Sequence, residues 1–113
     1  MTRITVTKKS GKIVAITCDG HTGYGIEGDD IVCAALSSIV QTAVLGLLSV
    51  VGVDVNMKRD DERGYLSATL PEKMTEKQRI QSAAILDTCL LGIGDLYEGY
   101  SNFINLEVLE DVY

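Results

Sequence analysis

The sequence has no tryptophan, one histidine and one proline, and aromatic residues make up only 5% of the chain. A core must therefore be built mainly from isoleucine, leucine, valine and alanine. The three cysteines, an odd number without paired spacing, argue against a secreted disulfide framework and favour a reducing, cytoplasmic location. Cysteine and histidine form no ligand cluster, so we expect no metal site and no cofactor. No apolar leader precedes Arg3, and we expect no signal peptide.

Basic residues are also scarce, and none lies between Lys12 and Lys58. The formal net charge is −6, and the isoelectric point is near 4.6. A phosphate-binding loop is excluded because its lysine is missing, and nucleic acid is not expected as a direct partner. The charge suits a basic protein as partner.

Charged residues are absent from one long stretch, Ile31 to Val53, which is long enough to span a bilayer. Serine, threonine and glutamine interrupt this stretch, and aspartates rather than basic anchors flank it. A helix that is apolar nearly all round is also typical of the buried helix in a small domain. We therefore expect a core helix and no membrane association.

Apolar periodicity divides the chain into short strands and two long helices, which we take as one domain over residues 1–113. The expected elements are a hairpin over 3–18, a glycine-rich loop over 20–28, a helix from about 30 to 51, strands over 53–58 and 65–70, a helix from Thr75 to about Gly99, and a strand over 104–108. The order ββαββαβ predicts an α+β fold of two layers, with two helices on a five-stranded sheet.

The only histidine, His21, directly follows Gly20 in the glycine-rich loop, and Cys33 comes twelve positions later. If Asp30 caps the helix, Cys33 lies in its first turn, where the helix dipole favours a thiolate. The loop glycines would let the imidazole fold over the start of the helix. Catalysis by a cysteine nucleophile and a general base requires at least a thiolate beside an imidazole.

Two further residues could support this pair, and each also has a simpler interpretation. Asp30 could orient the imidazole as the third member of a triad, or it could only cap the helix. Ser37, one turn after Cys33, could hydrogen-bond the sulfur or a substrate carbonyl, or only its own helix backbone. Cys33 itself could be a small buried apolar residue, which is the interpretation we give to Cys18 and Cys89.

The segment Gly20-His21 with its glycine-rich continuation, followed by Gly28-x-Asp30-Ile31-Val32-Cys33-Ala34-Ala35 and Ser37, resembles the ribosomal-processing cysteine protease family (Prp). The resemblance covers essentially the whole chain. It implies that His21 and Cys33 form the catalytic dyad, with Asp30, Ser37 and Gly20 in support. It also implies a small cytoplasmic homodimer that removes a short N-terminal extension from a basic large-subunit ribosomal protein.

Two other functions remain compatible with these residues. A non-catalytic ribosome-assembly or protein-binding module would use the acidic surface and would not need a reactive Cys33. A thiol redox sensor would oxidise Cys33 and would depend little on His21.

Overall fold

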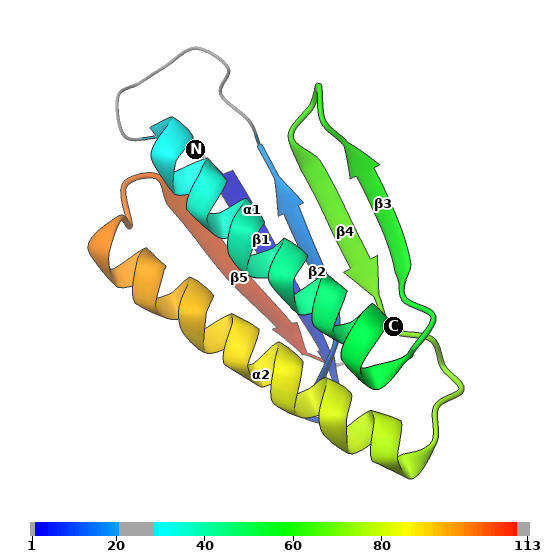
Figure 1. The fold of residues 1–113 in the computed structure, drawn as a ribbon. Coiled ribbons are helices and arrows are strands. Elements are labelled where there is room, and N and C mark those ends of the chain that lie inside the picture. The colour runs from blue at the N-terminus through cyan, green and yellow to red at the C-terminus, as the bar shows by residue number, and fades with distance from the viewer. Residues whose placement is uncertain (1, 21–28, 111–113) are drawn as a thin grey trace.

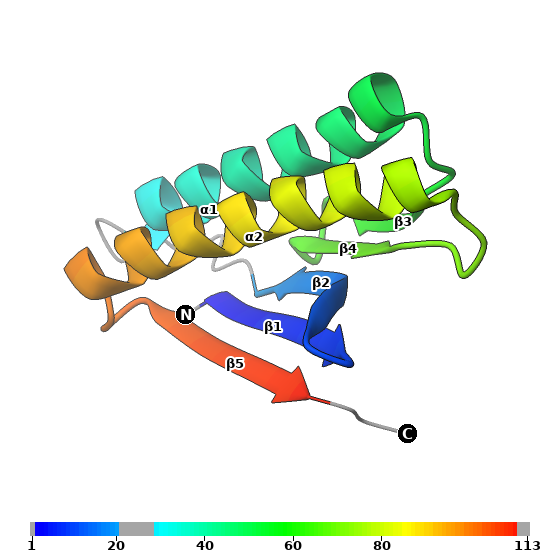
Figure 2. The ribbon, with the colours of Figure 1, turned by 90° about the horizontal axis from the view of Figure 1, so that it is seen from below.

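The computed structural model describes residues 2–20 and 29–110, in which two helices cover one face of a five-stranded sheet (Figure 1). The elements are β1 (Thr2–Lys9), β2 (Lys12–Asp19), α1 (Asp29–Leu45), the π-helical segment η1 (Gly46–Val51), β3 (Asn56–Asp60), β4 (Tyr65–Thr69), α2 (Glu76–Gly99) and β5 (Ile104–Glu110). The expected α+β fold and the order ββαββαβ are confirmed. Figure 2 shows both helices on the same side of the sheet.

The strands lie in the order β3-β4-β2-β1-β5. β1 is antiparallel to β2 and parallel to β5, so the first and last described strands are neighbours. A two-residue turn joins β1 to β2, and both of its residues, Ser10 and Gly11, have positive φ. This backbone matches the twist of a tight hairpin, as the Ser-Gly pair predicts.

The core lies between the sheet and the helix layer. Ile4 and Val6 of β1 are fully buried, as alternation along a strand requires. On α1, the residues Val32, Leu36 and Val40 are buried and recur every four positions, which places them on one face of the helix. The isoleucines and valines of the sheet thus meet one stripe of α1, and the adjacent stripe is left to face outward.

Among the described residues, the segment Ile31–Val51 has the length and apolar composition of a membrane-crossing helix. In the structure, its buried face packs on the sheet, while Ile31, Leu45 and Val50 are exposed. One face of the segment is therefore part of the core, and its relation to a membrane stays a prediction.

Element boundaries differ from expectation by one to three residues, as at the starts of α1 and β3. α1 begins at Asp29, so Asp30 lies inside the helix rather than at its N-cap, and Cys33 is the fifth helical residue. β3 begins at Asn56 instead of residue 53, because the N–H of Val53 bonds back to the carbonyl of Leu47 before the strand starts. The expected capping box of α2 is confirmed, since Thr75 and Gln78 exchange both hydrogen bonds.

Candidate active site

A groove of about 250 Å³ lies between α1 and the β3–β4 hairpin. One wall is α1, the other is the hairpin, and the ends of β1 and β2 close the groove between them. Its lining residues are Thr2, Cys18, Gly20, Cys33, Ala34, Ser37, Gln41, Arg59, Asp60, Asp61, Gly64, Tyr65 and Leu66. The candidate nucleophile thus faces a space that a peptide side chain can enter.

Cys33 is partly buried, and its sulfur lies close to two polar groups among the described residues. The Sγ atom lies 2.6 Å from the Thr2 hydroxyl and 3.7 Å from the Gly20 carbonyl oxygen. Because the helix begins at Asp29, Cys33 stands at the start of the second turn rather than in the first.

His21 lies outside the described residues, and so does the side chain of Asp30. Gly20, which directly precedes His21 in the chain, is described and has φ of 118°, a conformation that favours glycine. Its carbonyl oxygen contacts both Thr2 and Cys33. The chain therefore continues into His21 from a carbonyl that lies beside the thiol. The pairing of His21 with Cys33, and the choice between orienting and other roles for Asp30, stay predictions.

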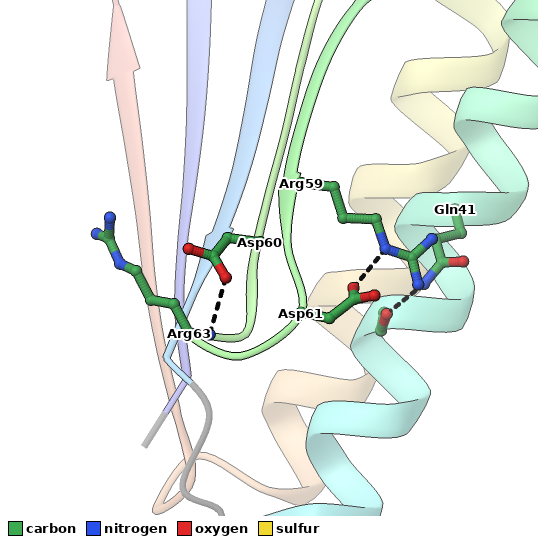
Figure 3. Close-up of polar contacts among 6 residues, drawn as sticks. Gln41, Arg59, Asp60, Asp61 and Arg63 are labelled. Carbon is green, nitrogen blue, oxygen red and sulfur yellow. Dashed lines mark hydrogen bonds and ion pairs between the residues drawn. The ribbon is translucent and has the colours of Figure 1, made fainter.

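Ser37 lies one turn beyond Cys33 in the groove wall, where the sequence placed it. Its hydroxyl accepts a hydrogen bond of 2.6 Å from the side-chain amide of Gln41, a further turn along the helix. Figure 3 shows Gln41 on the side of α1 that faces the hairpin. The residues Cys33, Ser37 and Gln41 form a polar stripe at four-residue spacing.

The hairpin wall carries charges of both signs. In Figure 3, Arg59 extends from β3 toward Gln41 of α1, and its Nε lies 2.6 Å from a carboxylate oxygen of Asp61. Arg63 points away from α1 in the same view. Its guanidinium binds Asp19 at 2.7 Å, which ties the hairpin tip to the end of β2 just before Gly20.

All three cysteines are free, and their surroundings differ. Cys18 and Cys89 are buried, which confirms their structural interpretation. Burial raises the pKa of Cys18 to about 12, with a smaller contribution from the nearby Cys33, and burial raises the pKa of Cys89 to about 11. Both thiols therefore stay neutral at physiological pH. Of the three cysteines, Cys33 is the one that lines the groove and is also partly exposed. Within residues 2–20 and 29–110, no group of His, Cys, Asp and Glu side chains could hold a metal ion.

Three groove residues, Thr2, Gln41 and Arg59, were not among the sequence candidates. Alternation with the apolar Ile4 would have placed Thr2 on the buried face of its strand. The four-residue spacing from Ser37 could have identified Gln41. No local signal marks Arg59, because its position opposite α1 depends on the pairing of distant strands.

Comparison with known proteins identifies the family. The family model of the cysteine protease Prp matches residues 1–105. The chain is 27% identical over 96 residues to the ribosomal processing cysteine protease Prp of Staphylococcus aureus (strain Mu50 / ATCC 700699), which covers 85% of this chain and 87% of that relative. It is 21% identical over 113 residues to the protein of the same name from Bacillus subtilis (strain 168), with 99% of each chain covered.

Solved structures agree with these matches. The fold is similar to the crystal structure of SMU.848 from Streptococcus mutans, with a TM-score of 0.87, 28% identity, and coverage of 98% of this chain and 96% of the other. It is also similar to Prp from S. aureus with a covalently linked product peptide, with a TM-score of 0.79, 25% identity, and coverage of 96% and 99%. With a partly exposed thiol in a groove and a family match over nearly its whole length, the chain belongs to the Prp family of cysteine proteases.

Proposed function

We propose that this protease removes a short N-terminal extension from a basic large-subunit ribosomal protein, with Cys33 as nucleophile and His21 as general base. The relatives from S. aureus and B. subtilis are named for ribosomal processing, and S. aureus Prp has been solved with a substrate peptide. The observation that carries the residue assignment is the contact of 3.7 Å between the Cys33 sulfur and the carbonyl of Gly20, the residue before His21.

The proposed reaction follows the general course of thiol proteolysis. His21 takes the thiol proton, and the Cys33 thiolate adds to the scissile carbonyl carbon. Collapse of the tetrahedral intermediate breaks the peptide bond, His21 returns its proton to the leaving amine, and a thioester remains on Cys33. A water molecule then gives a proton to His21 and adds to the thioester carbonyl carbon. The carbon–sulfur bond breaks, the product leaves as a carboxylate, and the proton on His21 returns to the Cys33 sulfur. Backbone N–H groups near the start of α1 are the proposed donors to the oxyanion.

Support for the substrate comes from the charge of the chain and from the shape of the groove. The net charge of −6 attracts a basic ribosomal protein and disfavours direct nucleic-acid binding. Ser37 and Gln41 offer polar groups to a peptide backbone in the groove beside Cys33. Three unpaired cysteines fit a cytoplasmic protein, and the packing of α1 on the sheet fits one that does not associate with membranes.

The homodimer is a further part of the proposal, supported by exposed apolar side chains on the helix layer. Val50 and Leu91 are each 75% exposed, and a groove of about 640 Å³ is lined by residues of α1, η1 and α2. Light scattering coupled to size-exclusion chromatography would measure the mass of the particle. We expect a dimer that Val50→Lys weakens, and a monomer at all concentrations would contradict this part.

Mass spectrometry of the organism's own N-terminally extended ribosomal protein tests the activity. Wild-type enzyme, Cys33→Ala and His21→Ala are incubated with the purified substrate, after circular dichroism has shown that each variant is folded. We expect removal of the extension by the wild type and its loss in both variants. Intact substrate in all three reactions would contradict the proposed substrate and favour the non-catalytic binding module. Full activity of His21→Ala would contradict its role as base.

A further inference from the structure

Thr2 places a buried hydroxyl between the proposed nucleophile and the segment that leads into His21. Its Oγ1 lies 2.6 Å from the Cys33 sulfur and 3.1 Å from the Gly20 carbonyl oxygen. The side chain is only 3% exposed. Three chain segments, the start of β1, the end of β2 and the second turn of α1, thus meet at one hydroxyl.

The backbone holds Thr2 firmly in this place. Its N–H donates to the carbonyl of Phe103 at 2.9 Å, and the residue pairs with Ile104 of β5. Alternation puts Thr2 on the same face as the buried Ile4, where an apolar side chain of the same shape would fit the pattern. A hydroxyl at such a position is costly unless it is hydrogen-bonded, and its described partners, Cys33 and Gly20, line the groove.

The number of protons limits how these three groups can bond. Gly20 offers only a carbonyl acceptor, while the Thr2 hydroxyl can donate one hydrogen and also accept. While Cys33 is a thiol, its S–H can donate to the Thr2 hydroxyl at 2.6 Å or to the Gly20 carbonyl at 3.7 Å, and the Thr2 hydroxyl donates to Gly20. Once Cys33 is a thiolate, the hydroxyl hydrogen is the only one left among the three groups. A bond to a charged acceptor is the stronger one, so the hydroxyl turns from Gly20 to the sulfur.

We propose that Thr2 is a positioning residue for the nucleophile, whose hydroxyl accepts from the Cys33 thiol and donates to the Cys33 thiolate. This inference rests on the proposed role of Cys33. The hydroxyl only rotates, and the thiol proton goes to the general base. When the thioester forms, the sulfur loses its charge and the hydroxyl returns to the Gly20 carbonyl. The hydrogen bond of Gly20, next to His21, therefore changes with each charge state of the sulfur.

Two threonine variants and one control isolate the hydroxyl. Thr2→Val keeps the shape and removes the hydroxyl, whereas Thr2→Ser keeps the hydroxyl and removes the methyl group. Thr5→Val makes the same change on the same strand, at a position whose side chain alternates to the other face of the sheet. Among the described residues, the other charged or titratable groups that line the groove are the same in all variants, namely Cys18, Arg59, Asp60, Asp61 and Tyr65.

The first readout is the rate of alkylation of Cys33 by iodoacetamide between pH 5 and 10, without substrate. The rate follows the thiolate fraction. We expect Thr2→Val to react about tenfold more slowly at neutral pH and its profile to move up by about one pH unit, because a bond to a charged group is lost. Thr2→Ser and Thr5→Val should keep the wild-type profile. A wild-type profile in Thr2→Val would overturn the proposal.

A second readout uses the wild-type protein and does not depend on how well Thr2→Val folds. The methyl resonance of Thr2, assigned by its absence in Thr2→Ser, is followed by NMR as the pH is raised. It should shift with the same midpoint as the alkylation profile and should stop doing so in Cys33→Ala. If the chemical shift of the Thr2 methyl group does not change around this midpoint, the proposal is overturned.

Cleavage assays separate this inference from the proposed function. If the wild type leaves the ribosomal substrate intact but Thr2→Val still moves the alkylation profile, the substrate assignment fails and Thr2 keeps its role. If wild type and Thr2→Val cleave the substrate equally well and also alkylate equally, the role of Thr2 fails and the proposed function stands.

Discussion

The side-chain amide of Gln41 donates a hydrogen bond of 2.6 Å to the hydroxyl of Ser37, one helical turn closer to Cys33. The bond occupies a lone pair of the hydroxyl and leaves its hydrogen free to donate. The sequence indicated that Ser37 would bond the sulfur, a substrate carbonyl or its own backbone. The structure adds a partner that keeps this hydroxyl oriented within the groove wall.

Replacing Gln41 with alanine should therefore weaken substrate binding while leaving Cys33 intact. Without the amide, the Ser37 hydroxyl turns back to its own helix, and one neutral hydrogen bond to the substrate is lost, which corresponds to a change of roughly 2- to 10-fold. We expect KM to rise by that factor with kcat little changed, as measured by cleavage at varied substrate concentration. Thr42→Ala is the matched control, since Thr42 already bonds the carbonyl of Ser38 in its own helix. An equal effect in both variants would contradict the role of Gln41.

Alkylation of the native protein should modify one cysteine only. Cys18 and Cys89 are 6% and 5% exposed, and burial raises the pKa of both thiols to about 12 and about 11. We expect iodoacetamide at pH 8 to add one group, on Cys33, and to add three after denaturation, as counted by mass spectrometry of peptides. Fast native labelling of Cys89 would show that the helix layer opens. Labelling of Cys33 no faster than a free model thiol would favour the binding module over the protease.

The buried thiols should also make the free energy of unfolding fall as the pH rises in the alkaline range. In the unfolded chain a cysteine titrates near pH 8.5, whereas Cys89 in the fold keeps its proton to about pH 11. Between these values the unfolded state loses a proton that the native state retains, so the free energy of unfolding falls as pH rises, by up to about 1.4 kcal/mol per pH unit for each such thiol.

Denaturant titrations of Cys89→Ala at several pH values test this linkage. The variant is expected to be less stable at pH 7 because of the cavity, but its stability should fall less steeply than that of the wild type between pH 9 and 11. Only the difference in slope is diagnostic, since tyrosines and lysines titrate in the same range in both proteins. Identical slopes would show that Cys89 does not contribute.

Gly52 should tolerate alanine poorly although there is space for it. It ends η1 with φ of 79°, and an added Cβ would meet nothing within 4 Å. The cost is therefore backbone strain alone, about 1 kcal/mol in the free energy of unfolding. Gly94, inside α2, also has open space around a Cβ, and alanine there should instead stabilise by roughly 0.5–1 kcal/mol. Thermal unfolding would measure the change in stability of each variant relative to the wild type. A change of the same sign in both variants would contradict the argument.

Much of the fold could be predicted because its signals are local. The turn at Ser10, the helix end at Gly52 and the capping box at Thr75 each depend on residues within a few positions of one another. The helix was expected from about residue 30 and α1 begins at Asp29, a difference no larger than that between methods of assigning helix ends. The π-helical end of this segment has no sequence pattern of its own.

The site was predicted where neighbours in sequence are neighbours on a helix, as with Cys33 and Ser37. Thr2 could not be connected to Cys33 in that way, because the two are separated by 31 positions. Their contact depends on the strand order, and strand order follows from packing between distant segments. His21 and the side chain of Asp30 lie outside the described part of the chain. Their interpretation as partners of Cys33 therefore stays a prediction.

The pairing of β1 with β5 has a consequence for how the protein becomes active during synthesis. Thr2 is held by Phe103 and Ile104, so the position of the hydroxyl beside the thiol depends on residues that are synthesised long after β1. Contacts of such long sequence separation form late and slow the search for the native state. A nascent chain that stops before β5 leaves one edge of β1 unpaired, so the backbone contacts that hold Thr2 beside Cys33 are absent until β5 has been made.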